Sequence, residues 1–423
     1  DPTGGTWYIA SVGGGVWKTT DEGATWNHLT DDMPTLAIQS LAMAASNNDV
    51  MYAGTGESYY NIDTMNGNGI LKSTDRGVNW TPLASTINDP RFNNVSRILI
   101  APTDPDFVIA STTVGRYKTS VTAESNIFRS FDGGATWSVA HTEAGPRITQ
   151  LMADPTDFSI QYACVDGGGI LKSTDTGASW AYINSGITDF SGRFEMAISP
   201  VNSDYLYVSA EGASGAELWV SWNAGSSWNQ TAESGTAVNW LGAQGWYDNT
   251  IICHPTDPTT VYVGGPELYS IVLNSVGSST RTTTALASYW FPHPDHHYLQ
   301  IVEPAGGGWY LLGTNDGGVT RTSSGVTNFT MPTDGMVTTQ FYGVDKRPGA
   351  SAYIGGTQDN GTWQSPLDPG PTSAWTAQIG GDGYETSWHF DDPQKIIGGY
   401  QYNGLQRTPD GGVTWSSATN GLN

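Results

Sequence analysis

Six polar turns along the chain each place one carboxylate directly after a short stretch rich in Val, Ile, Tyr and Leu. These carboxylates are Glu57, Asp166, Glu211, Glu267, Asp316 and Asp359. If they meet at one edge of the fold, two of them could act as the acid and base of glycoside hydrolysis, or several could bind Ca²⁺. They could also be turn-formers only, because Asp-Gly and Asn-Gly pairs suit tight hairpins. All three interpretations stay open.

The stretch YWFPHPDHHY at 289–298 is the densest polar and aromatic cluster of the chain. Its Asp295 and His296, together with Asp316, form a candidate metal-binding set, because imidazole and carboxylate groups can ligate a metal ion. Adjacent histidines in a strand point to opposite faces, so at most two side chains of the stretch could share one ion unaided. The other interpretation is a set of hydrogen-bonded histidines in a loop or channel.

Aromatic rings outside the repeated turns are candidate sugar-binding residues, because flat rings stack on pyranose faces. Trp240 and Trp246 lie in the long loop NWLGAQGWYD at 239–248, and Tyr59, Tyr60 and Tyr117 lie in longer insertions. Trp246 could instead fill space between sheets. The predicted ligand-binding residues are Trp240, Trp246, Asp248, His297, Gln340, Tyr342, Asp359 and Glu385.

An eight-residue pattern, S/T-x-D-x-G-x-x-W, occurs six times, with Asn in place of Asp once. The Asp side chain accepts backbone N–H groups across a tight turn, Gly adopts a positive φ, and Trp begins the next strand and packs between sheets. These residue types predict a structural role. The residues are Asp21, Trp26, Asp75, Trp80, Asp132, Trp137, Asp175, Trp180, Asn223, Trp228, Asp410 and Trp415.

A second pattern, a short apolar strand followed by a glycine-rich turn, occurs nine times, from GGTWYIASVGGG (4–15) to DPQKIIGGYQYNG (392–404). Units of roughly 47 residues with four antiparallel strands are typical of β-propeller blades. We therefore predict an all-β propeller of about nine four-stranded blades. The Asp turns join third and fourth strands, on the face opposite the candidate site residues.

The domain organisation has two interpretations. Residues 1–335 could form a seven-bladed propeller, with 336–423 supplying two blades of a second one. Alternatively, 1–423 could form one ring of nine or ten blades. The first copy lacks the strand that precedes the others, so we expect closure to need residues outside this sequence.

Composition excludes several classes of partner. The formal net charge is −23, with 40 Asp and Glu against 17 Lys and Arg, which disfavours nucleic acid and anionic lipid. No apolar stretch reaches the roughly 18 residues of a membrane helix, so no membrane insertion is expected. Cys164 and Cys253 are expected to be unpaired, and no zinc motif is present.

The repeated turn resembles the Asp-box, also called the bacterial neuraminidase repeat, which sialidases, sortilin-type receptors and two-propeller xyloglucanases share. The stretches GGGVWKTTDEGATW, QGWYD, HPDHH, NDGGV and GGTQDNGT look like those of secreted bacterial repeat proteins described as sortilin-like, many with a type 9 secretion signal. The resemblance implies tandem propellers in a longer chain and a secreted or cell-surface location in bacteria.

The resemblance leaves three hypotheses for function. A sialidase needs three arginines, and only Arg97 and Arg193 fall at starts of first strands, so that activity is not expected. Our main hypothesis is a secreted or cell-surface module that binds glycan or protein without catalysis and requires no cofactor. The alternative is a glycoside hydrolase similar to the xyloglucanases, with Asp166 and Asp316, in CVDGG and TNDGG, as its pair. The third is a structural part of a surface assembly.

Overall fold

The computed structural model describes residues 4–59, 61, 64–115, 123–145, 147–287, 291–370 and 373–421. Tyr60 and Tyr117 lie outside the described residues. Over the described residues the fold is all-β, with one 3-10 helix, η1 (Pro90–Phe92), and nine sheets. The chain divides into two compact units, Asp1–Met336 and Val337–Asn423.

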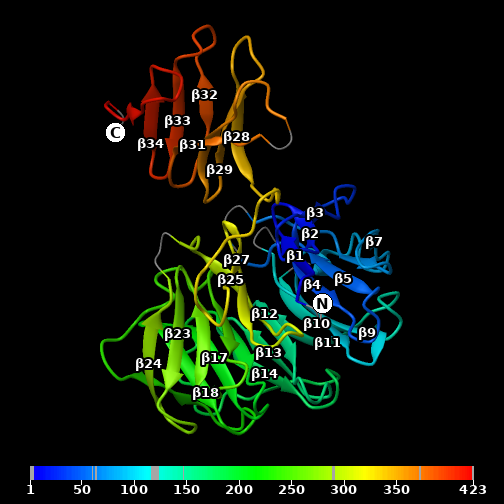
Figure 1. Cartoon of the computed structure of the whole chain (residues 1–423). Helices are drawn as coiled ribbons and strands as arrows, with labels where there is room; N and C mark the ends of the chain where they lie inside the picture. The colour runs from blue at the N-terminus through cyan, green and yellow to red at the C-terminus, as the bar shows by residue number, and fades with distance from the viewer. Residues whose placement is uncertain are drawn as a thin grey trace. The chain divides into compact units, whose positions relative to one another are not determined.

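Seven sheets lie in the described residues of the first unit, with consecutive strands paired antiparallel (Figure 1). The first three comprise β1 (Trp7–Ser11), β2 (Gly15–Thr19), β3 (Asn27–His28); β4 (Ile38–Met43), β5 (Met51–Thr55), β6 (Ile70–Ser73), β7 (Thr81–Pro82); and β8 (Val95–Ala101), β9 (Asp104–Thr112), β10 (Glu124–Ser130), β11 (Ser138–Ala144). The fourth and fifth comprise β12 (Ile148–Ala153), β13 (Gln161–Val165), β14 (Gly169–Ser173), β15 (Ala181–Tyr182); and β16 (Phe194–Ile198), β17 (Leu206–Gly212), β18 (Gly215–Ser221), β19 (Asn229–Gln230). The sixth and seventh comprise β21 (Thr250–Cys253), β22 (Thr260–Gly264), β23 (Leu268–Leu273), β24 (Thr280–Ala285) with β20 (Ala232–Glu233) parallel at its edge; and β25 (His296–Val302), β26 (Tyr310–Asn315), β27 (Gly318–Arg321).

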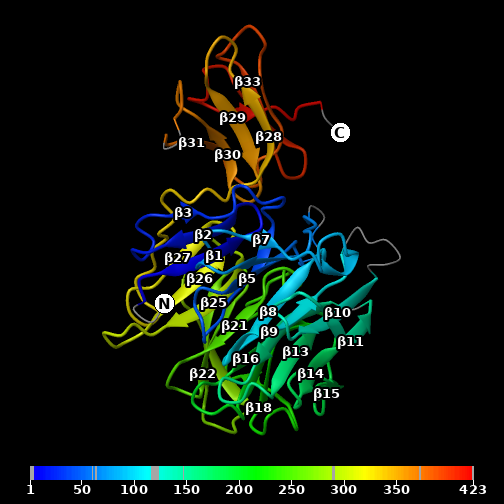
Figure 2. The ribbon, with the colours of Figure 1, turned by 90° about the vertical axis from the view of Figure 1, so that its right-hand side faces the viewer.

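These seven sheets form a closed ring. Among the described residues, seven clusters of buried apolar side chains each join two consecutive sheets, and the last joins the seventh sheet to the first. In that last cluster Trp7 packs on Tyr310, and both side chains donate to the Gly4 carbonyl, at 2.7 and 2.8 Å. Figures 1 and 2 show yellow β25–β27 beside blue β1 and β2. Closure therefore occurs with three-stranded first and seventh sheets, contrary to our expectation that it needs further residues.

The second unit contains two sheets in its described residues, packed through a small core of Ala352, Ile354, Trp388 and Ile396. They comprise β28 (Phe341–Lys346), β29 (Tyr353–Thr357), β30 (Gly361–Gln364), β31 (Thr376–Ile379); and β32 (Thr386–Trp388), β33 (Ile396–Tyr400), β34 (Gly404–Thr408), β35 (Ser416–Ser417).

The repeated turns are closed by hydrogen bonds to their aspartate. In the turn at 130–137, the Asp132 carboxylate accepts from the Ser130 hydroxyl at 2.8 Å and from the Thr136 backbone N–H at 2.9 Å. Asn223 makes the corresponding contacts with its amide oxygen, to Ser221 and Ser227. These carboxylates are therefore occupied by the turns themselves.

Each tryptophan of the repeated turns packs against the sheet that precedes its own. Trp80, for example, lies in the cluster between the first two sheets, and Trp228 lies in the cluster between the fourth and fifth. Burial of a ring of this size stabilises the fold by roughly 2–3 kcal/mol. The eight residues thus combine a turn with a contact between sheets. The six tryptophans placed in this way are Trp26, Trp80, Trp137, Trp180, Trp228 and Trp415.

The turn aspartates predict an acid-dependent loss of stability. Hydrogen bonds from Thr136 lower the pKa of Asp132 to about 2, and the pKa values of Asp175 and Asp410 are lowered to about 2 in the same way by Ser179 and Thr414. Since the unfolded value lies near 3.9, the stabilisation is complete above about pH 4 and is lost as the pH falls towards 2. Asp132→Asn is expected to reduce the fall in melting temperature between pH 4 and 2. Equal falls in variant and wild type would contradict this.

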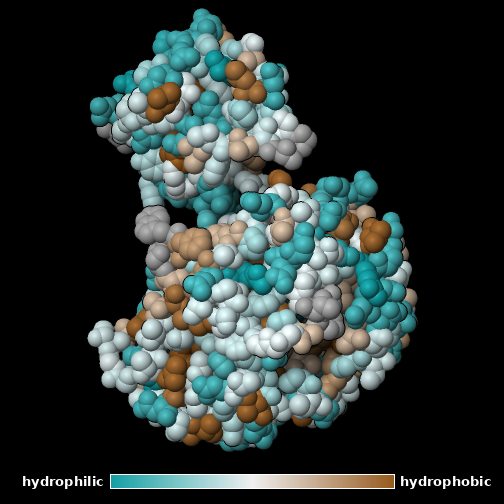
Figure 3. Space-filling view, in the orientation of Figure 1, coloured by the Kyte–Doolittle hydropathy of each residue, from teal (hydrophilic) through white to brown (hydrophobic). Residues whose placement is uncertain are grey.

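None of the helices in the described residues is long and apolar enough to cross a membrane. In the view of Figure 3, hydrophobic residues appear as separate brown groups on a largely white and teal surface.

Candidate functional site

In each sheet, antiparallel pairing places the turn between the second and third strands at the same end as the start of the first strand. The repeated Asp turns lie at the opposite end of the strands. In the sixth and seventh sheets this arrangement assembles a group of polar side chains. Asp316 lies in the turn between β26 and β27, His297 near the start of β25, Asp295 just before β25, and Asp248 two residues before β21.

Asp316 is held by two neighbours. His297 Nε2 lies 2.7 Å from its Oδ1, and the Tyr247 hydroxyl donates to its two oxygens at 3.4 and 3.3 Å. His297 Nε2 also lies 3.7 Å from Asp248 Oδ1. The Asp316 and His297 side chains keep 13% exposure each, so a ligand can reach them.

Asp248 and Asp295 form a coupled pair of carboxyl groups beside Asp316. Gln244 Nε2 donates to both, at 2.9 Å to Asp248 and 3.2 Å to Asp295. Burial raises the pKa of Asp248 well above its usual value, and the adjacent Asp295 raises it further. Burial also raises the pKa of Asp295. The pair therefore holds a proton more tightly than free aspartic acid does.

Asp295, the more accessible member of the pair, has a φ of 63°. This left-handed conformation is one that Asp tolerates better than most residues. It directs the backbone out of the loop and into β25, so that Asp295 and His297 reach the same cluster. We call Asp248, Asp295, His297 and Asp316 the acidic cluster.

Asp166, the other predicted catalytic residue, lies in a separate group on the fourth and fifth sheets. Its Oδ2 accepts from Arg147 Nε at 2.8 Å and also from Arg147 Nη2. Burial, with a contribution from Asp166, raises the pKa of the nearby Glu211. An ion pair with arginine occupies Asp166, whereas Asp316 faces a histidine and a tyrosine.

The two tryptophans predicted to bind a ligand, Trp240 and Trp246, differ in burial. Trp240 is 1% exposed, lies in the core between the fifth and sixth sheets, and donates from Nε1 to the Ser209 hydroxyl at 3.0 Å. The prediction that Trp240 stacks on a ligand is therefore wrong, because its long loop folds back into the core. Trp246 keeps 39% exposure and lies beside Tyr247, with ring centroids 5.4 Å apart.

The predicted metal-binding set is not assembled as a coordination sphere. His296 is 1% exposed, and burial lowers its pKa to about 3. No group of three His, Cys, Asp or Glu side chains in the described part of the chain could hold a metal ion. Asp295 and Asp316 belong instead to the hydrogen-bonded acidic cluster.

The four remaining predicted ligand-binding residues lie in the second unit. Tyr342 stacks on Tyr384 with centroids 5.3 Å apart and planes at 7°, and the Asp359 N–H donates to Asp382 at 2.8 Å. The Gln340 carbonyl accepts from the Gln358 N–H at 3.0 Å.

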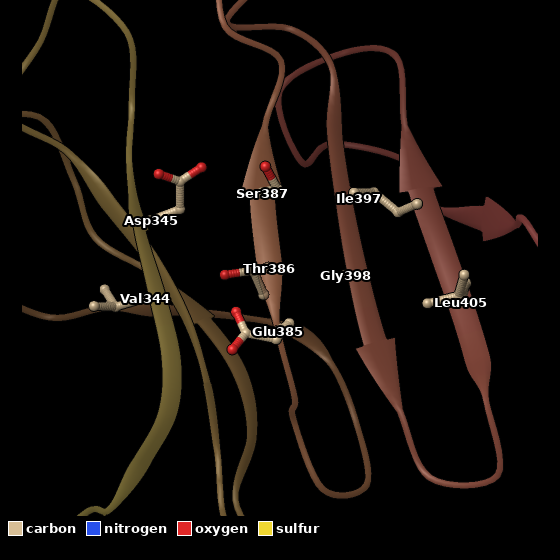
Figure 4. A pocket seen from close by; sticks show the side chains of 8 residues that line it. All are labelled: Val344, Asp345, Glu385, Thr386, Ser387, Ile397, Gly398 and Leu405. Carbon is tan, nitrogen blue, oxygen red and sulfur yellow. The ribbon is translucent and has the colours of Figure 1, made fainter.

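Glu385, the fourth of these residues, lines a hollow of about 440 Å³ (Figure 4). Figure 4 shows its carboxylate at the same hollow as Ile397 and Leu405. The lining residues are Val344, Asp345, Glu385, Thr386, Ser387, Ile397, Gly398 and Leu405. This hollow is built entirely from residues of the second unit.

Tyr247 and Gln244 are site residues that the sequence predictions missed. Both lie in the loop before β21, and both contact the acidic cluster. The stretch AQGWYD could have pointed to both residues, but only Trp246 and Asp248 were predicted from it as ligand-binding residues.

Comparisons with known proteins agree with this architecture. The family model Sortilin-Vps10 (sortilin, neurotensin receptor 3) matches residues 125–283. Xyloglucanase Xgh74A of Acetivibrio thermocellus is 30% identical over 142 residues, which cover 29% of this chain and 16% of that protein. A xyloglucanase of Hypocrea jecorina is 27% identical over 220 residues, which cover 46% and 24%. The crystal structure of an ancestral GH74 enzyme aligns with a TM-score of 0.59 and 15% identity, over 97% of this chain and 67% of that one.

The chain is a sortilin- and xyloglucanase-like propeller repeat protein. The matches of this chain cover only about a sixth to a quarter of the length of these curated relatives. Our main hypothesis of a non-catalytic binding module is wrong, because the curated relatives that match this propeller are named as xyloglucanases. The alternative hypothesis, a glycoside hydrolase, agrees better with these matches.

Proposed function

We propose that this propeller is a glycoside hydrolase, or the part of one that carries catalytic carboxylates, and that it acts on a xyloglucan-type β-glucan. The acidic cluster is the observation that carries the proposal. It combines a buried carboxyl pair that retains a proton with a third carboxylate positioned by a histidine and a tyrosine. The names of the curated relatives supply the substrate class.

Glycoside hydrolysis needs one carboxylic acid to protonate the leaving oxygen and one carboxylate to act at the sugar ring. Asp295, which shares its site with the buried Asp248, is the proton donor in this proposal. Asp316 is the second carboxylate, and its contacts to His297 and Tyr247 orient it. Because burial raises the pKa of Asp295, its acid form persists to a higher pH than that of free aspartic acid.

The proposal includes a setting for the reaction. The substrate glycan is the partner, no cofactor is required, and Ca²⁺ has at most a structural role. The protein is secreted or held at a bacterial cell surface, where it can meet extracellular polysaccharides. Residues 336–423 begin a second propeller, and 1–335 form a seven-bladed one.

Release of reducing sugar from xyloglucan by the full chain tests the proposal. Cellulose and laminarin serve as comparison substrates. Glu303→Gln is the matched control variant, because Glu303 is exposed and follows the far end of β25 from His297. Release by the wild type and by Glu303→Gln is expected, and absence of release from all three polysaccharides would overturn the proposal.

Trp246 is expected to provide a stacking surface for a sugar unit beside the acidic cluster. Its ring is 39% exposed and adjoins Tyr247, which contacts Asp316. Trp246→Ala is expected to raise KM for xyloglucan about fivefold, the equivalent of about 1 kcal/mol, and to leave kcat within about twofold. Trp246→Phe should recover part of the loss. An unchanged KM, or a loss confined to kcat, would remove Trp246 from the binding surface.

A further inference from the structure

Tyr59 contacts four sheets other than its own. It belongs to the loop that follows β5 of the second sheet. Its carbonyl accepts from Arg147 Nη1 of the loop before β12 at 2.7 Å, and its ring contacts Arg193, Tyr247 and His297, which lie at the starts of the fifth, sixth and seventh sheets. Only a position near the axis of the ring allows one residue, through its ring and its carbonyl, to reach all of these. Tyr59 therefore occupies the centre of the propeller mouth.

The base of this loop is well tied. The Glu57 N–H donates to the Met65 carbonyl at 2.9 Å, and Glu57 Oε2 accepts from the Met65 N–H at 3.1 Å. Gly56, with φ 96°, turns the chain and donates to the Ala37 carbonyl at 2.8 Å. Glu57 thus acts as a loop organiser, and these bonds hold the segment from which Tyr59 projects.

Below the Tyr59 ring lies a guanidinium group that is itself fixed. Arg193 is 1% exposed, and its Cζ atom lies 5.0 Å from the centroid of the Tyr59 ring. Arg193 donates to Glu195 Oε1 at 2.7 Å and to the Asn249 carbonyl at 3.1 Å. Burial raises the pKa of the Tyr59 phenol, so the phenol stays neutral over Arg193. The ring therefore has a rigid support.

The Tyr59 ring also stacks on His297. The two rings stack with centroids 4.8 Å apart and planes at 29°, and Tyr247 meets both rings edge-on. Nε2 of His297 faces Asp316 at 2.7 Å. Its Nδ1 is buried and has no hydrogen-bond partner among the described residues. An imidazole is usually oriented through a hydrogen bond at its second nitrogen, and here stacking takes that place.

We propose that Tyr59 is a positioning residue that sets the orientation of the His297 imidazole, and through it the orientation of the Asp316 carboxylate. Arg193, which is fixed in the fifth sheet, contacts Tyr59. Tyr59 stacks on His297, and His297 contacts the Asp316 carboxylate of the seventh sheet. The role of the stack in catalysis rests on the proposed hydrolase activity, whereas the orientation of His297 does not.

The first test reads His297 directly, in the full chain, by NMR of its Cε1–Hε1 group, assigned by its loss in His297→Gln. Tyr59→Leu removes the aromatic ring, so the ring-current shift of Hε1 is expected to disappear. Tyr59→Phe keeps the ring and should leave the Hε1 shift close to wild type. Tyr182→Ala is the matched control, since Tyr182 is half-exposed on the fourth sheet and its hydroxyl contacts Glu143.

The second test uses hydrolysis of xyloglucan. Tyr59→Leu is expected to lower kcat about 10- to 100-fold with KM within about twofold, and Tyr59→Phe to stay within about threefold of wild type. If the wild type releases no sugar while the NMR difference between Leu and Phe is present, the proposed function fails and the orienting role of Tyr59 stands. An unchanged His297 signal in a folded Tyr59→Leu protein, or equal effects of Leu and Phe, would overturn the inference.

Discussion

Asp316→Asn is expected to reduce the rate of xyloglucan hydrolysis by about 10³-fold, with little change in KM. The amide has the size of the carboxylate but can neither accept a proton nor carry the charge that the reaction requires at this position. It also puts an NH₂ donor in place of one carboxylate oxygen, so His297 Nε2 at 2.7 Å or the Tyr247 hydroxyl at 3.3 Å must act as the acceptor if that contact is to be kept. Reducing-sugar release at saturating xyloglucan measures the effect, and the melting temperature shows that the fold is intact.

Asp166→Asn separates this assignment from the pair, Asp166 and Asp316, that the sequence analysis named for the alternative hydrolase hypothesis. Asp166 forms an ion pair with Arg147, so its replacement is expected to weaken the contacts at the propeller mouth and to lower the rate of xyloglucan hydrolysis by about tenfold or less. Asp295→Asn, in contrast, is expected to lower this rate as much as Asp316→Asn does. A loss at Asp166 as large as that at Asp316, with Asp295→Asn still active, would move the catalytic acid to the fourth sheet. Full activity of Asp316→Asn would remove the acidic cluster from catalysis.

The repeated elements of the fold could be predicted because each carries its own local signal. The Ser130–Asp132–Thr136 turn is built from residues within seven positions, so its hydrogen bonds follow from the sequence pattern. The tryptophans at the ends of these turns fill the same gap between sheets each time. Two recurring patterns, one of turns and one of strands, are enough to predict radially packed sheets.

The site depends on contacts between different repeats, and these have no local signal. The sequence analysis assigned separate ligand-binding, metal-binding and catalytic roles to Asp248, Asp295, His297 and Asp316. These residues meet only because the first strands of the sixth and seventh sheets start side by side. Trp240 shows the opposite error, since a loop that looks exposed in sequence supplies a core residue. The reach of Tyr59 across the mouth follows only from the closed ring.

The pair Arg193 and Glu195 offers the strongest test of that ring as a physical unit. Arg193→Met is expected to lower the free energy of unfolding by about 3–5 kcal/mol, because it leaves the buried charge of Glu195 with only a longer contact, to Arg97 Nη2 at 3.9 Å. The two side chains are 1% and 3% exposed, and Arg193 also binds the carbonyl of Asn249 in the neighbouring sheet. Urea unfolding followed by tryptophan fluorescence measures the loss.

The matched control is Arg76→Met. It breaks the ion pair between Arg76 and Asp49, whose N–O distance is similar to that of the Arg193–Glu195 pair. Arg76 Nε lies 2.7 Å from Asp49 Oδ1, but the side chains are 61% and 51% exposed, so solvent screens the charges and the expected loss is below about 1 kcal/mol. Glu195→Gln together with Arg193→Met should recover part of the stability, because the double variant removes both charges of the buried pair. If Arg193→Met costs no more than Arg76→Met, the centre of the propeller is hydrated rather than closed. The stack of Tyr59 on Arg193 would then lack the rigid support that the orientation of His297 requires.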